Sequence, residues 1–296
     1  MKVYTFWEPR EKIPYYIQLC MKTWEKFLPN AEIILLDYKN LGEYIDVNEL
    51  GEMLFSGRFR LPQISDAIRV ALLAKHGGVW LDADTIVLNS KAEKYLLPDE
   101  KNRTLFFGHA RLHAPHIAYV NTPPASKCMN SWFGFIKERL KTLTPETEIN
   151  AFFLGNSFIN AYARENVDEV EVLTRRPVMP ELKLIPKSEN ENLQNRMVAH
   201  QTYYHMKNLH LVDVNADMIL LHNSWVPELY RGFSPEDLLL CDCTLTNILA
   251  EALGMELPPP EERFRLFQKE NKKWIKVPNT PPPPKKFRLV TRKNEE

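Results

Sequence analysis

Two aspartates one residue apart, Asp82 and Asp84, lie inside the apolar stretch "VWLDADTIVL". In a single strand, residues i and i+2 face the same side, so both carboxylates would project together. Carboxylates that close repel each other and raise one pKa unless a cation compensates them. Mg²⁺ and Mn²⁺ prefer oxygen ligands and also bind phosphate oxygens. The pair therefore indicates a divalent metal site with a phosphate-bearing ligand, although a capped loop with a surface salt bridge also explains the pattern.

A second pair of charged residues lies on the helix expected just before this strand. Asp66 and Arg69, in "SDAIR", are three residues apart and share a helical face distinct from the apolar one. An ordinary intrahelical ion pair, which contributes roughly a few tenths of a kcal/mol, would explain them. In the functional interpretation, Asp66 accepts hydrogen bonds from sugar hydroxyls. Arg69 then contacts a hydroxyl or phosphate, or orients Asp66.

The elements that must position these residues alternate between strand and helix. Strands are expected at 2–7, 31–37 and 79–88, with helices at 13–28 and 61–78 between them. This order favours right-handed crossovers and a parallel sheet, which binds ligands at the carboxyl ends of its strands. At the end of the second helix, Gly77 sits where a left-handed cap is expected.

The second part of the chain shows weaker patterns. We expect helices at 128–140 and 157–166, and strands at 104–110, 117–121, 169–174, 182–186 and 216–222. The intervening loop "GHARLHAPH" holds His109, His113 and His116 and is a candidate to line a ligand site. Its spacings fit no standard zinc motif, so we assign these histidines no role.

Composition narrows the class of protein. The 296 residues are 44% hydrophobic and 26% charged with zero formal net charge, which argues against a nucleic-acid-binding surface over the whole chain. We expect neither a signal peptide nor a membrane span, because no apolar run approaches about 20 residues. Four scattered cysteines favour reduced thiols in a cytoplasmic protein. Cys241 and Cys243 lack a second pair, so buried thiols are preferred over a metal role.

The C-terminal part is basic. From about Glu261 the apolar periodicity fades, and a proline run occupies 281–284. A solvated, partly disordered tail explains this composition. Attachment to an anionic membrane face or an acidic partner is the functional alternative.

The acidic motifs and the residues between them resemble a known family. The stretch "SDAIRVALLAKHGGVWLDADTIVL", with S-D-x-x-R, G-G and D-x-D, is similar to the core of glycosyltransferase family 32 and of the capsular polysaccharide synthesis glycosyltransferases. The opening "YTFWEPREKIPYYIQLCMKTWEKF" and "LGEYIDV" resemble the capsular group, so the likeness covers residues 1–90 well. It implies a GT-A fold, that is, an α/β protein with a Rossmann-like, mixed but mostly parallel sheet flanked by helices. It also implies Mn²⁺ or Mg²⁺ and a nucleotide-sugar donor, with a UDP-sugar favoured.

The resemblance also implies roles for the acidic motifs. Asp84 is the direct metal ligand, and Asp82 contacts the ribose, the sugar or the metal. Asp66 and Arg69 contact the donor sugar.

Other positions carry implied roles as well. Phe6 and Trp7 end the first strand where the nucleobase would lie, and simple core packing is their alternative. Asn156 corresponds to a helix start near the donor sugar and acceptor, while Ser157 is a candidate helix cap.

The stretch "MILLHNSW" corresponds to a C-terminal motif of such enzymes. His222 is implied as a third metal ligand, and Ser224 and Trp225 as contacts to the diphosphate. A structural histidine at a strand end is the alternative.

The implied reaction is glycosyl transfer with retention to a hydroxyl of a glycan or lipid-linked glycan, in capsule, lipopolysaccharide or other surface polysaccharide synthesis. No covalent nucleophile is evident, so we expect a front-face displacement. Residues 1–260 would form the catalytic domain, with the nucleotide-sugar-binding half at 1–100, the acceptor half at 101–260 and a tail at 261–296. The protein would act in the cytoplasm, at the inner face of the membrane, with no nucleic-acid partner.

Two other functions remain open. In a haloacid-dehalogenase-like phosphatase, Asp82 would be the nucleophile and Asp84 a general acid. Such an enzyme also needs a later lysine and acidic pair, and its motif normally opens the domain. The third candidate is a non-catalytic module that binds sugar nucleotides.

Overall fold

The computed structural model describes residues 1–150, 152–174, 203–204, 216–221, 223, 226–268 and 273–279. The strand expected at 182–186 lies outside these residues, as do His222, Ser224, Trp225 and the proline run.

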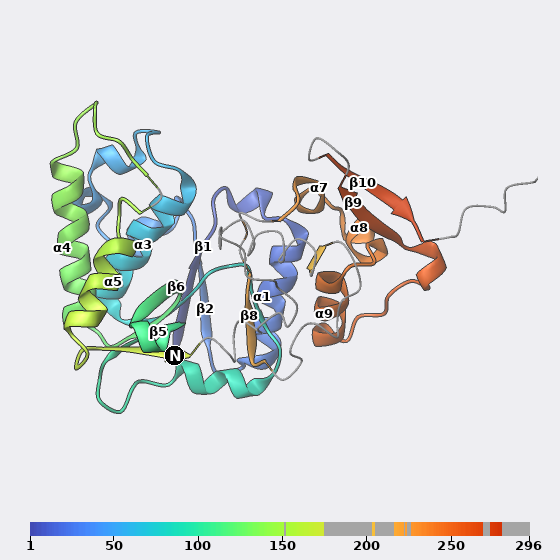
Figure 1. Ribbon diagram of the computed structural model, residues 1–296, viewed down its shortest axis with the longest axis horizontal. Helices are drawn as coiled ribbons and strands as arrows, with labels where there is room; N and C mark the ends of the chain where they lie inside the picture. Colours follow the sequence, from blue (N-terminus) through green and yellow to red (C-terminus); the bar gives the residue numbers. More distant parts are fainter. Residues whose placement is uncertain are drawn as a thin grey trace, which may run out of the picture.

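A six-stranded sheet forms the framework of the N-terminal part of the chain (Figure 1). Its strands, in spatial order, are β2 (Glu32–Leu36), β1 (Lys2–Phe6), β3 (Gly78–Leu81), β6 (Ala114–Thr122), β5 (Thr104–His109) and β7 (Val170–Thr174). β1 pairs in parallel with β2 and β3, and β5 pairs in parallel with β7. β6 runs antiparallel to both β3 and β5. All strands but β6 therefore run one way, which confirms the predicted mixed, mostly parallel sheet.

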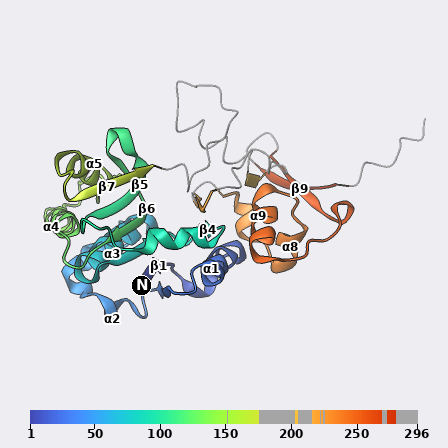
Figure 2. The ribbon, with the colours of Figure 1, turned by 90° about the horizontal axis from the view of Figure 1, so that it is seen from below.

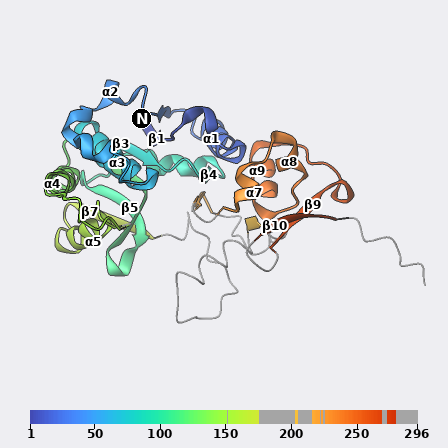
Figure 3. The same ribbon diagram turned by 90° about the horizontal axis from the view of Figure 1, so that it is seen from above.

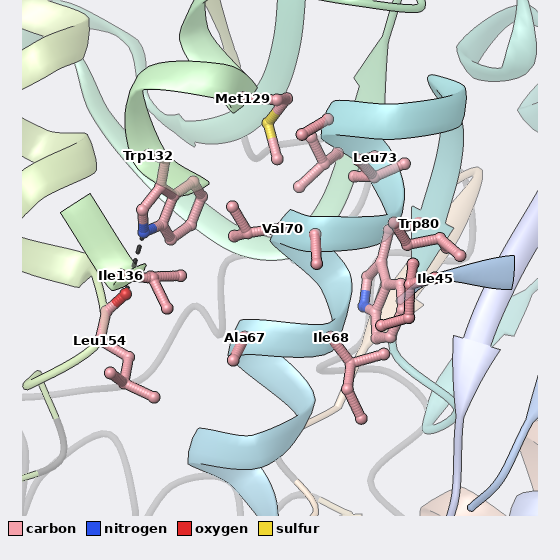
Figure 4. Close-up of a cluster of buried hydrophobic side chains, with 14 of the residues drawn as sticks. Ile45, Ala67, Ile68, Val70, Leu73, Trp80, Met129, Trp132, Ile136 and Leu154 are labelled. Atoms are coloured by element: carbon pink, nitrogen blue, oxygen red, sulfur yellow. Dashed lines mark hydrogen bonds between the residues drawn. The ribbon is translucent and has the colours of Figure 1, made fainter. Parts of the chain in front are cut away.

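Helices cover both faces of this sheet because its strands alternate apolar side chains between the faces. Tyr4 and Trp80 point into a core built with α3 (Leu61–His76), α4 (Lys127–Lys141) and α5 (Asn156–Glu165). Figure 4 shows this core, in which Ala67, Ile68 and Val70 of α3 lie between the two buried tryptophans. Val3 and Val79 point the other way, into a core with α1 (Tyr15–Phe27). The helices expected around 13–28, 61–78, 128–140 and 157–166 are thus confirmed.

The C-terminal part packs against α1 (Figures 2 and 3). It comprises α7 (Glu228–Arg231), α8 (Pro235–Leu240), α9 (Thr244–Leu253) and the antiparallel pair β9 (Phe264–Gln268) and β10 (Trp274–Pro278). The remaining short elements are α2 (Leu41–Tyr44) and 3-10 turns at Arg10–Lys12, Val47–Leu50, Glu52–Phe55, Ser90–Leu96, Ala110–Leu112 and Pro260–Glu262.

Structure continues past residue 260, where the sequence analysis expected a solvated tail. Leu266 of β9 is buried, and Arg263 forms a buried ion pair with Asp242 at 3.1 Å. The alternation of "RFRLFQ" has the period of a strand, which a search for helical periodicity overlooks.

One expected strand is wrong in its extent. The stretch at 79–88 is divided into β3 and β4 (Thr85–Val87), and β4 leaves the main sheet to pair antiparallel with β8 (Met218–Leu220). Between them the backbone N–H of Thr85 donates to the carbonyl of Asp82 at 2.9 Å, which closes a turn. Aspartates favour such turns because their side chains bind nearby backbone amides. The D-x-D motif therefore forms a turn, not the middle of a strand.

Two further expectations can be compared with the described residues. All four cysteines are buried and unpaired, as expected for reduced thiols. No helix in the described ranges has the length and apolar character needed to cross a bilayer.

The start of α5 depends on a glycine. A Cβ at Gly155 would lie 2.1 Å from Nε1 of Trp132, whose indole is buried and donates to the carbonyl of Leu154 at 3.0 Å (Figure 4). Only a residue without a side chain lets α5 begin this close to α4. Gly155 also occupies the N-cap, so Ser157 is not the cap that the sequence suggested.

We expect Gly155→Ala to lower the free energy of unfolding by about 2 kcal/mol or more, because the indole must move within a close-packed core. Gly134→Ala is the matched control: it lies in the interior of α4 with nothing within 4 Å of the added Cβ. It should stabilise the helix by roughly 0.5–1 kcal/mol. Urea unfolding of both variants measures the difference, and equal stabilities would contradict this account.

Candidate active site

The D-x-D turn lies at the carboxyl end of β3, where parallel sheets bind their ligands. The backbone N–H of Asp82 still donates to the carbonyl of Ala118 on β6 at 2.9 Å. This bond ties the start of the turn to the edge of the sheet. Asp82 and Asp84 are close enough for the charge of one to raise the pKa of the other.

A buried arginine joins the turn to α3. Arg69 is 2% exposed, and its guanidinium donates to Oδ1 of Asp66 at 2.9 Å and to Oδ1 of Asp82 at 2.7 Å. It also stacks over the ring of Trp80, with 4.9 Å between Cζ and the ring centroid. The pair predicted on α3 is therefore not an isolated surface ion pair. A planar guanidinium reaches two acids and an aromatic face at once, which a lysine cannot do.

The two oxygens of Asp82 have different surroundings. Oδ1 accepts from Arg69 and from Nε1 of Trp80, the latter at 2.8 Å. No group in the described part of the chain donates to Oδ2, and the side chain of Asp82 is 33% exposed. One oxygen thus fixes the carboxylate while the other can face a ligand.

Asp84 is instead buried, and a distant segment holds it. Its Oδ2 accepts the backbone N–H of Asn223 at 2.6 Å. The side-chain oxygen of Asn223 accepts from the hydroxyl of Tyr16, and its carbonyl accepts from the guanidinium of Arg231. Tyr16 of α1 and Arg231 of α7 therefore meet at Asn223, which in turn holds this carboxyl.

Burial makes ionisation of this site costly. Burial, and secondly the charge of Asp82, raises the pKa of Asp84 to about 8, although Asn223 and Arg69 act in the opposite direction. Burial also raises the pKa of Asp66 to about 6 against the effect of Arg69. One guanidinium, which contacts Asp66 and Asp82 directly, must compensate three carboxyl groups, so their full ionisation leaves an excess of negative charge.

The donor set fits a hard divalent cation. Asp82 and Asp84 supply carboxylate oxygens, and the buried, uncompensated acid of Asp84 is the group that such a cation would stabilise. The described residues contain no cluster of three or more His, Cys, Asp or Glu side chains arranged for a metal. Mg²⁺ sites in proteins often use one or two carboxylates plus substrate phosphates, so two protein ligands are sufficient.

Of the other expected site residues, Phe6 ends β1, which pairs in parallel with β3, so it lies at the same carboxyl edge of the sheet as the D-x-D turn. Phe6 is buried, with its ring centroid 5.7 Å from that of the exposed Tyr38. Trp7 is half-buried, and its backbone N–H donates to Leu36. Asn156 begins α5, and no contact within the described ranges joins it to the aspartates.

Sequence reasoning missed several residues of this site. Trp80 lies two residues before Asp82 and carried a usable signal, because i and i+2 share a face. Asn223 stands in the "HNSW" motif but was given no role of its own. Tyr16 and Arg231 carried no local signal, since only the tertiary fold brings them near Asp84.

Comparison with known proteins identifies the family. Residues 1–170 of the 296-residue chain match the model of the capsular polysaccharide synthesis proteins. The chain belongs to this family. The match confirms the resemblance to the capsular glycosyltransferases and the expected enzyme class, and no curated protein matched the sequence.

Three solved structures are similar to this capsular polysaccharide synthesis protein. The PaToxG glycosyltransferase is 17% identical, with a TM-score of 0.37, covering 56% of this chain and 68% of its own. The galactosyltransferase LgtC, in complex with donor and acceptor sugar analogs, is 13% identical, with a TM-score of 0.44, covering 88% and 98%. An active-site mutant of LgtC is 12% identical, with a TM-score of 0.41 and coverage of 87% and 98%.

The pKa of Asp84 gives a prediction for stability. The folded protein keeps this proton up to about pH 8, whereas the unfolded chain loses it near pH 4. Stability without metal therefore falls as pH rises from about 4 to about 8. Asp84→Asn removes this loss, so its Tm in EDTA should exceed that of the unmodified protein by a margin that grows over this range and is constant above it.

Asp217→Asn is the matched control, because Asp217 is equally buried. Burial opposes its ionisation, but hydrogen bonds from Lys94 at 2.7 Å and Tyr95 at 2.8 Å outweigh burial and lower its pKa. This variant should lose Tm at neutral pH, by a difference that shrinks as pH falls below about 4. A margin for Asp84→Asn that does not change with pH would contradict the burial argument.

Loss of Arg69 should be costly. Arg69→Met leaves Asp66 and Asp82 without their cation, and breaking a buried pair typically costs about 3–5 kcal/mol. We expect a loss of about 3 kcal/mol in urea unfolding, the lower end, because Asp82 is partly exposed. Arg69→Lys should recover only part of this, since one ammonium replaces a fork that reaches both acids.

Arg103→Met is the control for the general loss of stability caused by removing an arginine that pairs with two acids. Arg103 lies just before β5, at the opposite edge of the sheet from Asp82. It pairs with Asp99, at 2.9 Å, and with Glu171. Both variants should be destabilised, but only loss of Arg69 should change the affinity for Mn²⁺. Unaltered Mn²⁺ binding in Arg69→Met would show that Arg69 does not position the carboxylates of the candidate metal site.

Proposed function

We propose that this protein is a metal-dependent glycosyltransferase that moves a sugar from a nucleotide-sugar donor to a hydroxyl of a glycan or lipid-linked glycan, in capsule, lipopolysaccharide or other surface polysaccharide synthesis. The observation that carries the proposal is the excess of carboxylates around Arg69 and the D-x-D turn, at the ligand-binding edge of the sheet. The favoured donor is a UDP-sugar.

The proposed division of labour follows the geometry. Asp82 and Asp84 would hold Mn²⁺ or Mg²⁺, which would supply positive charge to the diphosphate leaving group. Arg69 fixes Asp82 through Oδ1, which would leave Oδ2 to contact the ligand. Asp66, also held by Arg69, accepts hydrogen bonds from the donor sugar. Asn223 fixes the orientation of Asp84 through its backbone N–H.

The acceptor hydroxyl attacks the anomeric carbon as the bond to the diphosphate breaks, through an oxocarbenium-like transition state. We propose a front-face displacement in which the departing diphosphate takes the acceptor proton, with retention of configuration. Phe6 and Trp7 would flank the nucleobase. His222, Ser224 and Trp225 would contribute a further metal ligand and diphosphate contacts, and Asn156 would contact the donor sugar or the acceptor.

Release of nucleoside diphosphate tests the proposal directly. The protein with Mn²⁺ and a panel of UDP-, GDP- and CDP-sugars should release the diphosphate from one donor, and EDTA should stop the reaction. Asp82→Asn and Asp84→Asn should each lower the rate at least about 100-fold, the scale typical of losing one preorganised electrostatic group. Asp168→Asn, an exposed aspartate outside the cluster, is the control and should leave the rate unchanged.

Other outcomes identify the competing functions. Release of phosphate from a phosphomonoester would indicate the phosphatase, and donor binding without turnover would indicate the binding module. Either result, or full activity in EDTA, would overturn the proposal. The configuration of the product's new glycosidic bond, read by proton NMR, tests retention separately.

A further inference from the structure

A second polar site lies beside the sheet, between the end of the β5–β6 hairpin and α5. It is a cavity of about 630 Å³, within the size range of small-molecule sites. Residues 111–114 of the hairpin line one side, and Ser157, Asn160 and Arg164 of α5 line the other. Figure 2 shows the hairpin end beside α5. We call this cavity the hairpin–α5 pocket.

The pocket is cationic. Arg111 and Arg164 both line it, and no acidic side chain does. Both arginines are exposed, and neither has an ion-pair partner within the described ranges of the chain. Two unpaired guanidinium groups around one cavity attract an anion, and planar guanidinium groups suit carboxylate and phosphate oxygens.

Polar groups beside the arginines also lack partners. Oδ1 of Asn160 and Nδ1 of His113 are buried atoms without a hydrogen bond to any described residue. Buried polar atoms normally find a partner, and rotation of either side chain toward the cavity would let a ligand group supply it. The amide oxygen of Asn160 suits a sugar hydroxyl. His113 also has a positive φ of 44°, a strained conformation that tends to occur at functional sites.

The spacing on α5 places its three pocket residues on one face. Ser157, Asn160 and Arg164 are separated by three and four residues, while Ile159 and Ala163 on the opposite side are buried in the core. The glycine N-cap described above fixes the start of this helix against Trp132. The three pocket residues of α5 are thus carried by a helix whose position is fixed.

The pocket opens at the same edge of the sheet as the D-x-D turn. Asp82 bonds to Ala118 of β6, and the pocket residue Ala114 begins that strand. Four residues of strand separate them, a distance of about 13 Å. A glycan whose end lies at the donor site can therefore reach the pocket with a unit further along its chain.

We propose that the hairpin–α5 pocket binds an oxyanion, a carboxylate or a phosphate ester, carried by the acceptor glycan, so that the enzyme acts on acidic acceptors. This inference rests on the proposed function for its assignment to an acceptor. Arg111 and Arg164 bind the anion, and Asn160 accepts a hydroxyl of the same sugar unit. His113 lies in the loop whose histidines had no assigned role, and the side chain of His109 lies outside the described residues.

Binding of small acidic sugars tests the pocket without turnover. Dissociation constants for glucuronic acid, glucose 6-phosphate and glucose are measured by NMR titration on the metal-free protein in EDTA. An acidic sugar should bind more tightly than glucose. Each of Arg111→Gln and Arg164→Gln should weaken its binding about tenfold, and the double variant by more, as expected for loss of a charge-assisted hydrogen bond. Preference for glucuronic acid would identify a carboxylate, and preference for glucose 6-phosphate a phosphate.

Arg265→Gln on β9 is the matched control, since it removes one exposed arginine without a described partner. It should bind acidic sugars as the unmodified protein does. Equal affinities for glucose and both acidic sugars, or weakening by Arg265→Gln as large as by Arg164→Gln, would overturn the inference. Donor hydrolysis with Mn²⁺ distinguishes the failures. Hydrolysis without acidic-sugar binding would contradict only the proposed role of the pocket. Arginine-dependent binding without hydrolysis would contradict only the proposed transferase function.

Discussion

The arrangement of this protein's acidic site depends on one buried guanidinium. Arg69 lies on the buried side of α3. Removing its charge from water is unfavourable unless carboxylates and an aromatic face surround it. Asp66 provides one partner from the same helix, and the turn after β3 must supply the second. The requirement to pair Arg69 therefore fixes where the D-x-D turn lies against α3. Trp80 completes the arrangement by binding Oδ1 of Asp82 and covering the guanidinium.

The same arrangement leaves Asp84 poorly compensated. Asp82 takes the contact with Arg69, while the more deeply buried Asp84 receives backbone N–H groups, from Asn223 and from Asp84 itself, and the more distant effect of Arg69. Such an acid destabilises the folded chain at neutral pH, and a site under stability pressure alone would hold a neutral residue there. The packed core around α3 and the two tryptophans offsets that cost. A cation that binds at Asp84 would therefore supply the positive charge that the protein itself does not provide to this carboxylate.

Local patterns were enough to predict most of the sheet and its helices. The apolar stripes of α1 and α3 have helical spacing, and β1 and β2 are short runs of strand-forming residues. Local sequence patterns are therefore sufficient to predict these four elements. The contact between Asp66 and Arg69 was visible for the same reason. The break between β3 and β4 was not, because both halves are apolar and β4 leaves the sheet only to pair with β8, far along the chain. The roles of Tyr16 and Arg231 beside Asn223 likewise arise from tertiary packing and have no sequence-local signature.

The single antiparallel strand also has a consequence for the site. In a fully parallel sheet, the start of every strand lies at the edge opposite the ligands. Because β6 runs against β3, its first residues lie at the same edge as Asp82, and so does the hairpin that joins it to β5. Gly108 permits this close return, since a Cβ there would lie 2.2 Å from the carbonyl oxygen of Ala114. Reversal of one strand thus places a second set of polar side chains on the ligand-binding edge, where only the carboxyl ends of parallel strands would otherwise lie.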